Sequence, residues 1–226
     1  MSVTEDSSPA TSTSLPAPVA DPAPLGLAAF ALTTFLLSAS NAGWMTRATT
    51  FAWVGYAFAY GGAAQLLAGM WEFRNRNVFG ATAFGSYGGF WLGLGFWYLF
   101  VVRAKPVAAL PPPAVAALNH DVAWILLAWA IFNTYMLISS MQVNAAVFAV
   151  FLTLEVTEII LLIGNFTSSQ LAPTGIVKIG GYVGVLTAIV AWYTSWAGVM
   201  NGLHGGRQIL PVGKPFFPRA LAAGSR

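Results

Sequence analysis

The chain has 226 residues, of which 57% are hydrophobic and only 8% are charged, and its mean hydropathy is +0.69. Soluble domains carry about 25% charged residues, so this chain cannot cover a water-exposed surface and is predicted to be an integral membrane protein. The net charge of +3 comes without a basic tract, which argues against nucleic-acid binding. The absence of cysteine excludes disulfides, thiolate metal sites and cysteine nucleophiles.

Residues 1–20 are rich in Ser, Thr, Pro and Ala, and Glu5 and Asp6 are their only charges. A secretory signal needs a basic start and an apolar run, and this segment has neither. It is interpreted as a disordered N-terminal tail.

The next segment joins this tail to the first apolar stretch and consists of Asp21, Pro22, Ala23, Pro24, Leu25, Gly26 and Leu27. Prolines fit the first turn of a helix, where backbone N–H groups are unpaired anyway. Asp21 is a good N-cap residue. The segment therefore predicts a fixed helix entrance whose free N–H groups and positive dipole end favour anions.

Six apolar stretches follow, each close to the ~20 residues that cross a bilayer. The predicted fold is an all-α, six-helix transmembrane bundle over residues 21–204, followed by a C-terminal tail at 205–226. The predicted spans are residues 24–45, 50–71, 80–102, 121–139, 144–164 and 177–200. Short connections make successive helices antiparallel neighbours, and an even number of spans places both termini on one side.

The basic residues give the predicted orientation. The side of the termini holds six of them (Arg74, Arg76, Arg207, Lys214, Arg219 and Arg226), and the other side holds four (Arg47, Arg103, Lys105 and Lys178). The positive-inside rule then favours cytoplasmic termini. Glu72, Arg74 and Arg76 are expected to form a solvated cluster at the membrane boundary.

Two kinds of residue within the spans are informative. Gly85 and Gly89 have the small-xxx-small spacing that lets helices approach closely, and tight packing is the ordinary interpretation. Gln65 lies among small neighbours, where its amide group could donate to a carboxylate or form an interhelical hydrogen bond.

Several blocks resemble the acetate uptake transporter family (Gpr1/Fun34/YaaH). Residues 21–35 (DPAPLGLAAFALTTF) resemble the signature of its first helix, and residues 60–72 (YGGAAQLLAGMWE) and 79–91 (FGATAFGSYGGFW) resemble its second and third helices. Residues 151–154 (FLTL), 163–165 (IGN) and 191–193 (AWY) resemble its fifth and sixth helices. The blocks occur in order, with sensible spacing, between about residue 21 and residue 215.

The resemblance implies a six-helix protomer of a homohexameric ring in the cell membrane, with a path for acetate and related small carboxylates in each protomer. It also implies a narrow point built from Phe30, Tyr87 and Leu154. A hydrophobic constriction can gate by dewetting, and a phenolic hydroxyl group can donate to a passing carboxylate. No cofactor or metal is implied.

The family usually has Asn where this chain has Asp21. Both residues can cap a helix, but an ionised carboxylate repels an anion whereas an amide can donate to it. Capping is therefore preferred for Asp21 over direct contact with the substrate.

Glu155 and Glu158 fall in the middle of the fifth span, where ionisable residues are costly and usually face a bundle interior or a cavity. Glu158 lies one turn beyond Leu154 and shares its face, whereas Glu155 points about 100° away. Two interpretations stay open. At least one acid takes up a proton during transport, or the two are held structurally by Lys178 or by Tyr and Trp donors.

Enzymatic functions find little support, because no nucleophile-elbow, phosphate-loop or zinc-protease motif is present. The two histidines, His120 and His204, lie at span edges. The preferred hypothesis is a transporter or channel for small monocarboxylates, with proton coupling left open. The alternative is a membrane sensor or assembly protein that uses the same bundle without transport.

Overall fold

The computed structural model describes residues 19–45, 51–102, 110–170, 172–173 and 175–217, and these form helices joined by short turns. The α-helices are α1 (Ala23–Asn41), α2 (Ala52–Phe58), α3 (Gln65–Arg74), α4 (Val78–Trp97), α5 (Pro112–Ser140), α6 (Ala145–Thr167) and α7 (Gly175–Leu203). Two π-helical segments, η1 (Ala59–Ala64) and η2 (Tyr98–Val102), extend α2 and α4. No strand occurs among the described residues.

Four of these helices, α1, α5, α6 and α7, are long and apolar enough to cross a membrane. The other two predicted spans are built differently. The segment α2–η1–α3 is one uninterrupted helical run from Ala52 to Arg74, and α4 with η2 is another from Val78 to Val102. Within the first run, α2 and α3 have only 7 and 10 residues, so neither is long enough by itself to cross a bilayer.

The observed helices match the six predicted stretches in position, with one substantial difference. α5 begins at Pro112, nine residues before the predicted start at residue 121, because prolines at the first positions begin a helix instead of ending one. The tail at residues 1–18 and the connections at 46–50 and 103–109 lie outside the described residues, as do residues 218–226.

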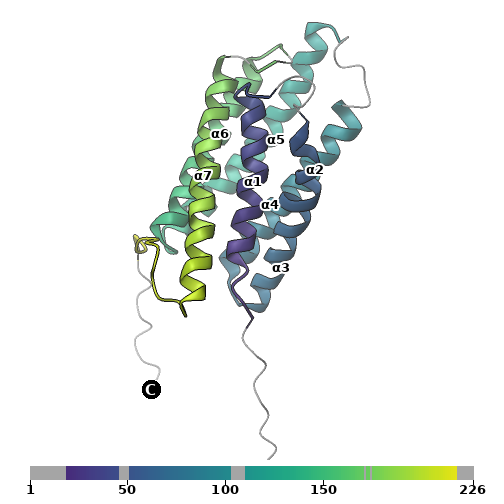
Figure 1. Cartoon of the computed structure of the whole chain (residues 1–226). Helices are drawn as coiled ribbons and strands as arrows, with labels where there is room; N and C mark the ends of the chain where they lie inside the picture. The colour runs from purple at the N-terminus through teal and green to yellow at the C-terminus, as the bar shows by residue number, and fades with distance from the viewer. Residues whose placement is uncertain (1–18, 46–50, 103–109, 171, 174, 218–226) are drawn as a thin grey trace, which may run out of the picture.

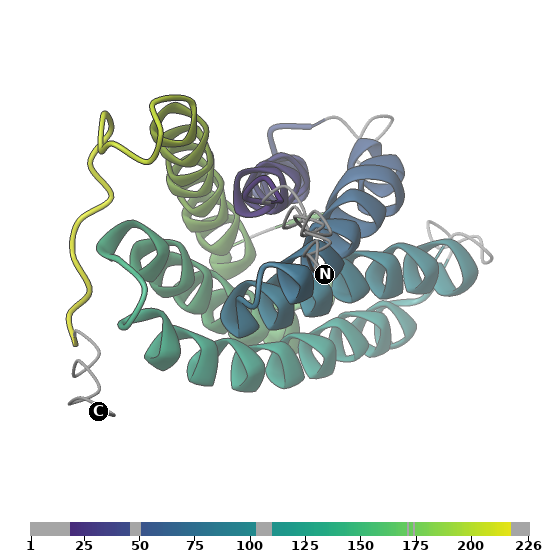
Figure 2. The same ribbon diagram turned by 90° about the horizontal axis from the view of Figure 1, so that it is seen from below.

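The helices run side by side in a bundle, and the described ends of the chain lie at the same end of it (Figure 1). Seen along the bundle, α1 lies between α7 and the α2–α3 run (Figure 2).

Glycine residues allow the closest approaches between these helices. A Cβ atom at Gly181 of α7 would collide with the backbone of Ala42 at the end of α1, and one at Gly69 of α3 would collide with the backbone of Gly85 in α4. Gly89 faces open space, so only Gly85 of the predicted pair makes such a contact.

Glu72 does not lie in a solvated cluster, contrary to the sequence-based expectation. Its side chain is fully buried, because the turn after α3 folds the first turn of α4 over it. A Cβ atom at Gly80 would lie 2.5 Å from Oε1 of Glu72, and Arg76 in this turn adopts a positive φ of 57°. Hydropathy alone places a carboxylate near the boundary but does not reveal that a neighbouring helix covers it.

Part of the predicted C-terminal tail packs on the helices. The amide group of Ala146 at the start of α6 donates to the carbonyl oxygen of Val212 (2.9 Å), and the amide group of Phe216 donates to that of Met141 (2.9 Å). The hydroxyl group of Tyr193 donates to the carbonyl oxygen of Pro211 (2.6 Å). These bonds connect residues 205–217 to α6, to α7 and to the turn between α5 and α6.

Candidate functional site: a vestibule and a constriction

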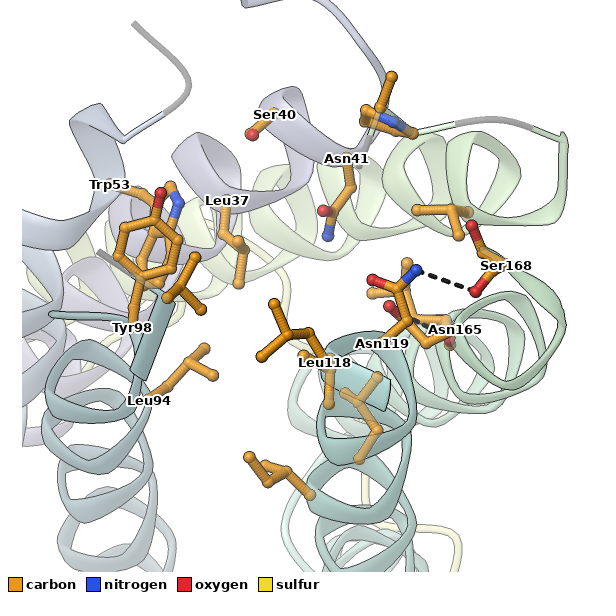
Figure 3. A pocket seen from close by; sticks show the side chains of 18 of the residues that line it. Leu37, Ser40, Asn41, Trp53, Leu94, Tyr98, Leu118, Asn119, Asn165 and Ser168 are labelled. Atoms are coloured by element: carbon orange, nitrogen blue, oxygen red, sulfur yellow. Dashed lines mark hydrogen bonds between the residues drawn. The ribbon is translucent and has the colours of Figure 1, made fainter. Parts of the chain in front are cut away.

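A large cavity of about 800 Å³ occupies the end of the bundle opposite the chain termini. Its walls come from the last turns of α1, α4 and α6 and the first turns of α2, α5 and α7, and we call it the vestibule. In Figure 3, Leu37 and Asn41 of α1 face Leu118 and Asn119 of α5 across it. Its polar side chains include Ser40, Asn41, Asn119, Asn165, Ser168 and Lys178. The vestibule can therefore hold a small polar anion.

Asn119 fixes one wall of the vestibule. Its side-chain amide group donates to the carbonyl oxygens of Ser168 (2.9 Å, dashed in Figure 3) and Gln170 (3.3 Å). These bonds connect α5 to the segment that follows α6. Lys178 is exposed in the first turn of α7, where its charge adds to the positive end of the helix dipole. The rim of the vestibule is therefore electropositive at this helix end.

A second cavity of about 50 Å³ lies next to the vestibule, deeper in the bundle. The two cavities share five lining residues: Leu37, Asn41, Phe90, Leu126 and Leu161. Phe30 of α1, Tyr87 of α4 and Leu154 of α6 all line the small cavity. Three residues chosen from three separate sequence blocks therefore meet at one point in the bundle.

These three residues are buried, with 5%, 3% and 7% of their surfaces exposed for Phe30, Tyr87 and Leu154. The rings of Phe30 and Tyr87 meet edge to face, with centroids 5.7 Å apart. On the side of the chain termini, Leu27, Phe84 and Phe151 belong to the same buried cluster. The apolar cluster thus fills the bundle between the small cavity and the end that carries the chain termini.

The segment 21–27 begins α1 on the closed side of this cluster. The carboxylate of Asp21 accepts the N–H group of Ala23 (2.9 Å), as a capping side chain does, although Pro22 is the residue that directly precedes the helix. Ser195 of α7 donates to the carbonyl oxygen of Pro24 (2.6 Å). A Cβ atom at Gly26 would lie 2.6 Å from the ring of Phe84, so glycine is needed for this ring to pack on α1.

Glu158 lines the small cavity beside Leu154, and 4% of its surface is exposed. Among the described residues, its Oε2 atom and the hydroxyl group of Thr34, which lines the same cavity, have no hydrogen-bond partner. Unpaired buried polar groups are costly. A water molecule takes about 30 Å³ in the liquid, so the cavity offers room for a small polar guest that would satisfy them.

Glu155 points away from this cavity toward α5. The side-chain amide group of Asn133 donates to its Oε2 atom (2.6 Å), and Thr134 lies 2.8 Å from its Oε1 atom. The hydroxyl group of Tyr87 donates to Oδ1 of Asn133 (2.8 Å). A hydrogen-bonded chain therefore runs from the constriction to Glu155, with Asn133 as its central residue.

Gln65 is almost fully buried at the start of α3, and its Oε1 atom has no partner among the described residues. It lies one turn from Gly61, which approaches Thr33 of α1, and one turn from Gly69, which approaches α4. Neither cavity includes Gln65 among its lining residues. The structure thus places it between helices, apart from both cavities.

The vestibule and Asn133 are the two features that the sequence-based reasoning missed. Asn133 is an isolated amide in an apolar stretch, the same signal that identified Gln65. The vestibule could not be identified in this way because its lining residues come from six separate helix ends. Within the described ranges, no group of three His, Asp or Glu residues is placed to hold a metal ion.

The model of the GPR1/FUN34/yaaH family matches residues 4–205. The chain belongs to this family. The family resemblance inferred from residues 21–35 and the later blocks is thus confirmed.

Three of the named relatives are transport proteins. Acetate permease A of Emericella nidulans is 40% identical over 213 residues, covering 90% of this chain and 69% of the permease. The succinate-acetate/proton symporter SatP of Escherichia coli strain K12 is 34% identical over 204 residues, covering 87% of this chain and 96% of SatP. Ammonia transport outward protein 2 of Saccharomyces cerevisiae is 38% identical over 203 residues, covering 88% of this chain and 70% of that protein.

The fold agrees with a solved structure of the bacterial acetate channel SatP. The two structures superpose with a TM-score of 0.73 at 30% sequence identity, covering 87% of this chain and all of the SatP chain. These relatives are transporters and channels and not enzymes, which confirms the prediction made from the missing catalytic motifs. The chain is a membrane protein of a transport family.

Proposed function

We propose that this chain is the protomer of a cell-membrane transporter or channel for acetate and related small monocarboxylates, with its constriction at Phe30, Tyr87 and Leu154. One observation carries the proposal. Side chains from α1, α4 and α6 converge at the inner end of a largely apolar vestibule that carries polar side chains and Lys178, and they close it. The acetate permease and acetate channel in the same family indicate the substrate class.

The physics of the site supports a small monoanion. The electropositive rim at Lys178 attracts carboxylates, and the side-chain amide group of Asn41 can replace part of their hydration. The constriction is apolar and narrow, so it admits a short hydrocarbon tail and excludes bulkier ones. Water leaves such a passage readily, which provides a gate.

Glu158 is the residue to which we assign proton handling. It lines the small cavity next to Leu154, and its Oε2 atom has no partner among the described residues, so a proton can reside there without breaking a contact. Glu155 is held by Asn133 and Thr134, which favours a structural role for it. The name of the symporter SatP supports proton coupling in the family.

The protomer is proposed to cross the membrane six times, counting the α2–η1–α3 and α4–η2 runs, with cytoplasmic termini. Both described chain ends and the end of α3, at Arg74, lie at one end of the bundle, which supports the orientation from the positive-inside count. A homohexamer is proposed from the family resemblance. Thr134 is exposed beside Glu155 on the outer face of α5 and α6, and a neighbouring protomer there would shield this carboxyl group from lipid.

Uptake of radiolabelled acetate into proteoliposomes tests the proposed function. The wild-type chain should give flux above empty vesicles, and an inward proton gradient should increase it. Leu37→Trp should abolish flux, because Leu37 lies where the two cavities meet and the vestibule has room for the larger ring. Leu25→Trp, at an exposed position on the same helix, is the matched control. No wild-type flux would favour the sensor or assembly alternative.

A further inference from the structure

We propose that Asn133 is the positioning residue of the constriction. Its amide group ties the hydroxyl group of Tyr87 to the carboxyl group of Glu155, so that a passing carboxylate meets the ring of Tyr87 and not its hydroxyl group. This inference rests on the proposed transport function and deepens it, because it states which surface of the constriction selects the substrate.

The orientation of the Asn133 amide group is fixed by its neighbours. Its Nδ2 atom donates both hydrogens, one to the carbonyl oxygen of Phe151 (3.0 Å) and one to Oε2 of Glu155 (2.6 Å). Turning the amide group around would place Oδ1 against that carbonyl oxygen, which cannot donate. Oδ1 must therefore face Tyr87, and it can only accept a hydrogen bond.

The Tyr87 hydroxyl group must therefore be the donor in this hydrogen bond. It has one hydrogen, and that hydrogen is donated to Oδ1 of Asn133 at 2.8 Å. Its ring is also enclosed, with centroids 5.7 Å from that of Phe30 and 5.4 Å from those of Trp129 and Phe132. Donation to a substrate would require breaking a buried bond and leaving Asn133, which is fully buried, with an unpaired acceptor.

The Glu155 end of this hydrogen-bonded chain keeps its geometry whether or not Glu155 carries a proton. The hydroxyl group of Thr134 lies 2.8 Å from both the carbonyl oxygen of Ala130 and Oε1 of Glu155, but it has one hydrogen to donate. An ionised Glu155 accepts that hydrogen. A protonated Glu155 donates from Oε1 to Thr134, which then donates to Ala130.

In both protonation states, Oε2 of Glu155 still accepts from Asn133. Besides Glu155, the titratable groups that interact electrostatically with Tyr87, at the other end of the hydrogen-bonded chain, are Glu158 of α6 and Tyr135 of α5. Neither is a hydrogen-bond partner of Asn133 in the described structure. The position of Tyr87 should therefore be insensitive to the charge of Glu155.

Four variants and one control separate this positioning role from a general structural one. Asn133→Leu removes both ends of the link and frees the Tyr87 hydroxyl group into the constriction, where it can pair with a substrate hydroxyl group. The uptake ratio of lactate to acetate should rise about fivefold, as expected for one gained hydrogen bond. Adding Tyr87→Phe removes the freed hydroxyl group and should return the ratio to near the wild-type value.

Tyr87→Phe alone keeps the ring that lines the constriction but leaves Oδ1 of Asn133 unpaired, so acetate uptake should fall only in proportion to the loss of folded protein, and the lactate-to-acetate ratio should stay at the wild-type value. Glu155→Gln should keep the wild-type ratio, since its amide group can still accept from Asn133 and donate to Thr134. Thr153→Val is the control for removing a hydroxyl group from α6. The Thr153 hydroxyl group bonds only to carbonyl groups of its own helix.

An acetate uptake per folded protein that falls tenfold or more in Tyr87→Phe, about 1.4 kcal/mol, would overturn the inference, since the hydroxyl group would then serve the substrate. The inference would also be overturned if the lactate-to-acetate ratio did not rise in Asn133→Leu, or if adding Tyr87→Phe to that variant did not restore the ratio. Melting temperatures of the purified full chain test the link without transport. The melting temperature of the Asn133→Leu/Tyr87→Phe double variant should fall no further than that of Asn133→Leu alone. If it falls by the sum of the two single-variant decreases, the link is refuted, even if the wild type carries no acetate.

Discussion

Leu154→Ala should widen the constriction and shift the size preference of the site toward longer carboxylates. Leu154 lines the 50 Å³ cavity and is 7% exposed, so truncating it enlarges a space that already exists. In soluble cores a Leu→Ala change costs ~2–5 kcal/mol. Lipid tails are as apolar as leucine, so the hydrophobic part of this cost is small within a bilayer. We expect a loss near ~2 kcal/mol, and the variant should fold.

The functional magnitude follows from the size of one methylene group. In a filled apolar pocket, an extra methylene costs ~1–3 kcal/mol, or about 10- to 200-fold in rate. Propionate exceeds acetate by one methylene. If the truncation relieves the lower end of this cost, the uptake ratio of propionate to acetate should rise about tenfold.

The assay is parallel uptake of labelled acetate and propionate into proteoliposomes at equal protein content. Leu152→Ala is the matched control, because Leu152 lies on the same helix and is 42% exposed. An unchanged ratio in Leu154→Ala, with both fluxes reduced in proportion to the folded protein, would refute the assignment of Leu154 to the constriction. A rise of the same size in Leu152→Ala would refute it as well.

Three further predictions follow from the same geometry. Glu158→Gln should impair proton-driven uptake more than Glu155→Gln at equal expression, because only Glu158 lines the small cavity; wild-type uptake and pH dependence in Glu158→Gln would contradict its proton role. Gly26→Ala should cost ~1–3 kcal/mol, measured as a lower melting temperature, because its Cβ atom would lie 2.6 Å from the Phe84 ring, and unchanged melting would argue against this contact. Lys178→Gln should slow acetate uptake severalfold at low ionic strength and little at high salt, where charge attraction is screened, and equal slowing at both would exclude electrostatic steering.

Much of the fold could be predicted from apolar stretches alone. Each of the six predicted stretches coincides with a helical run, because hydrophobic length and backbone hydrogen bonding leave few alternatives in a bilayer. The start of α5 at Pro112 was the largest boundary error, since proline at a first turn and proline at a break give the same local sequence signal. Burial of Glu72 was missed for a different reason, because it depends on a neighbouring helix.

The candidate site was predictable in part. Family resemblance selected Phe30, Tyr87 and Leu154, which the bundle brings to one cavity, and helical spacing placed Glu158 on the face of Leu154. The role of the Tyr87 hydroxyl group was expected to be donation to a substrate. The structure gives its hydrogen to Asn133 instead, a residue 46 positions away in the chain that no local pattern connects to it.

The sequence by itself determined that this protein is an integral membrane helix bundle whose first helix starts with a capping residue at Asp21 and whose fifth apolar stretch contains two acids. These features depend on composition and on spacing within one helix. Only the tertiary structure decided that the open vestibule lies at the end opposite Asp21 and that Glu155 is bonded while Glu158 faces a cavity. The physical reason is that cavities and hydrogen-bonded chains form between helices, so they depend on how each helix is rotated toward its neighbours.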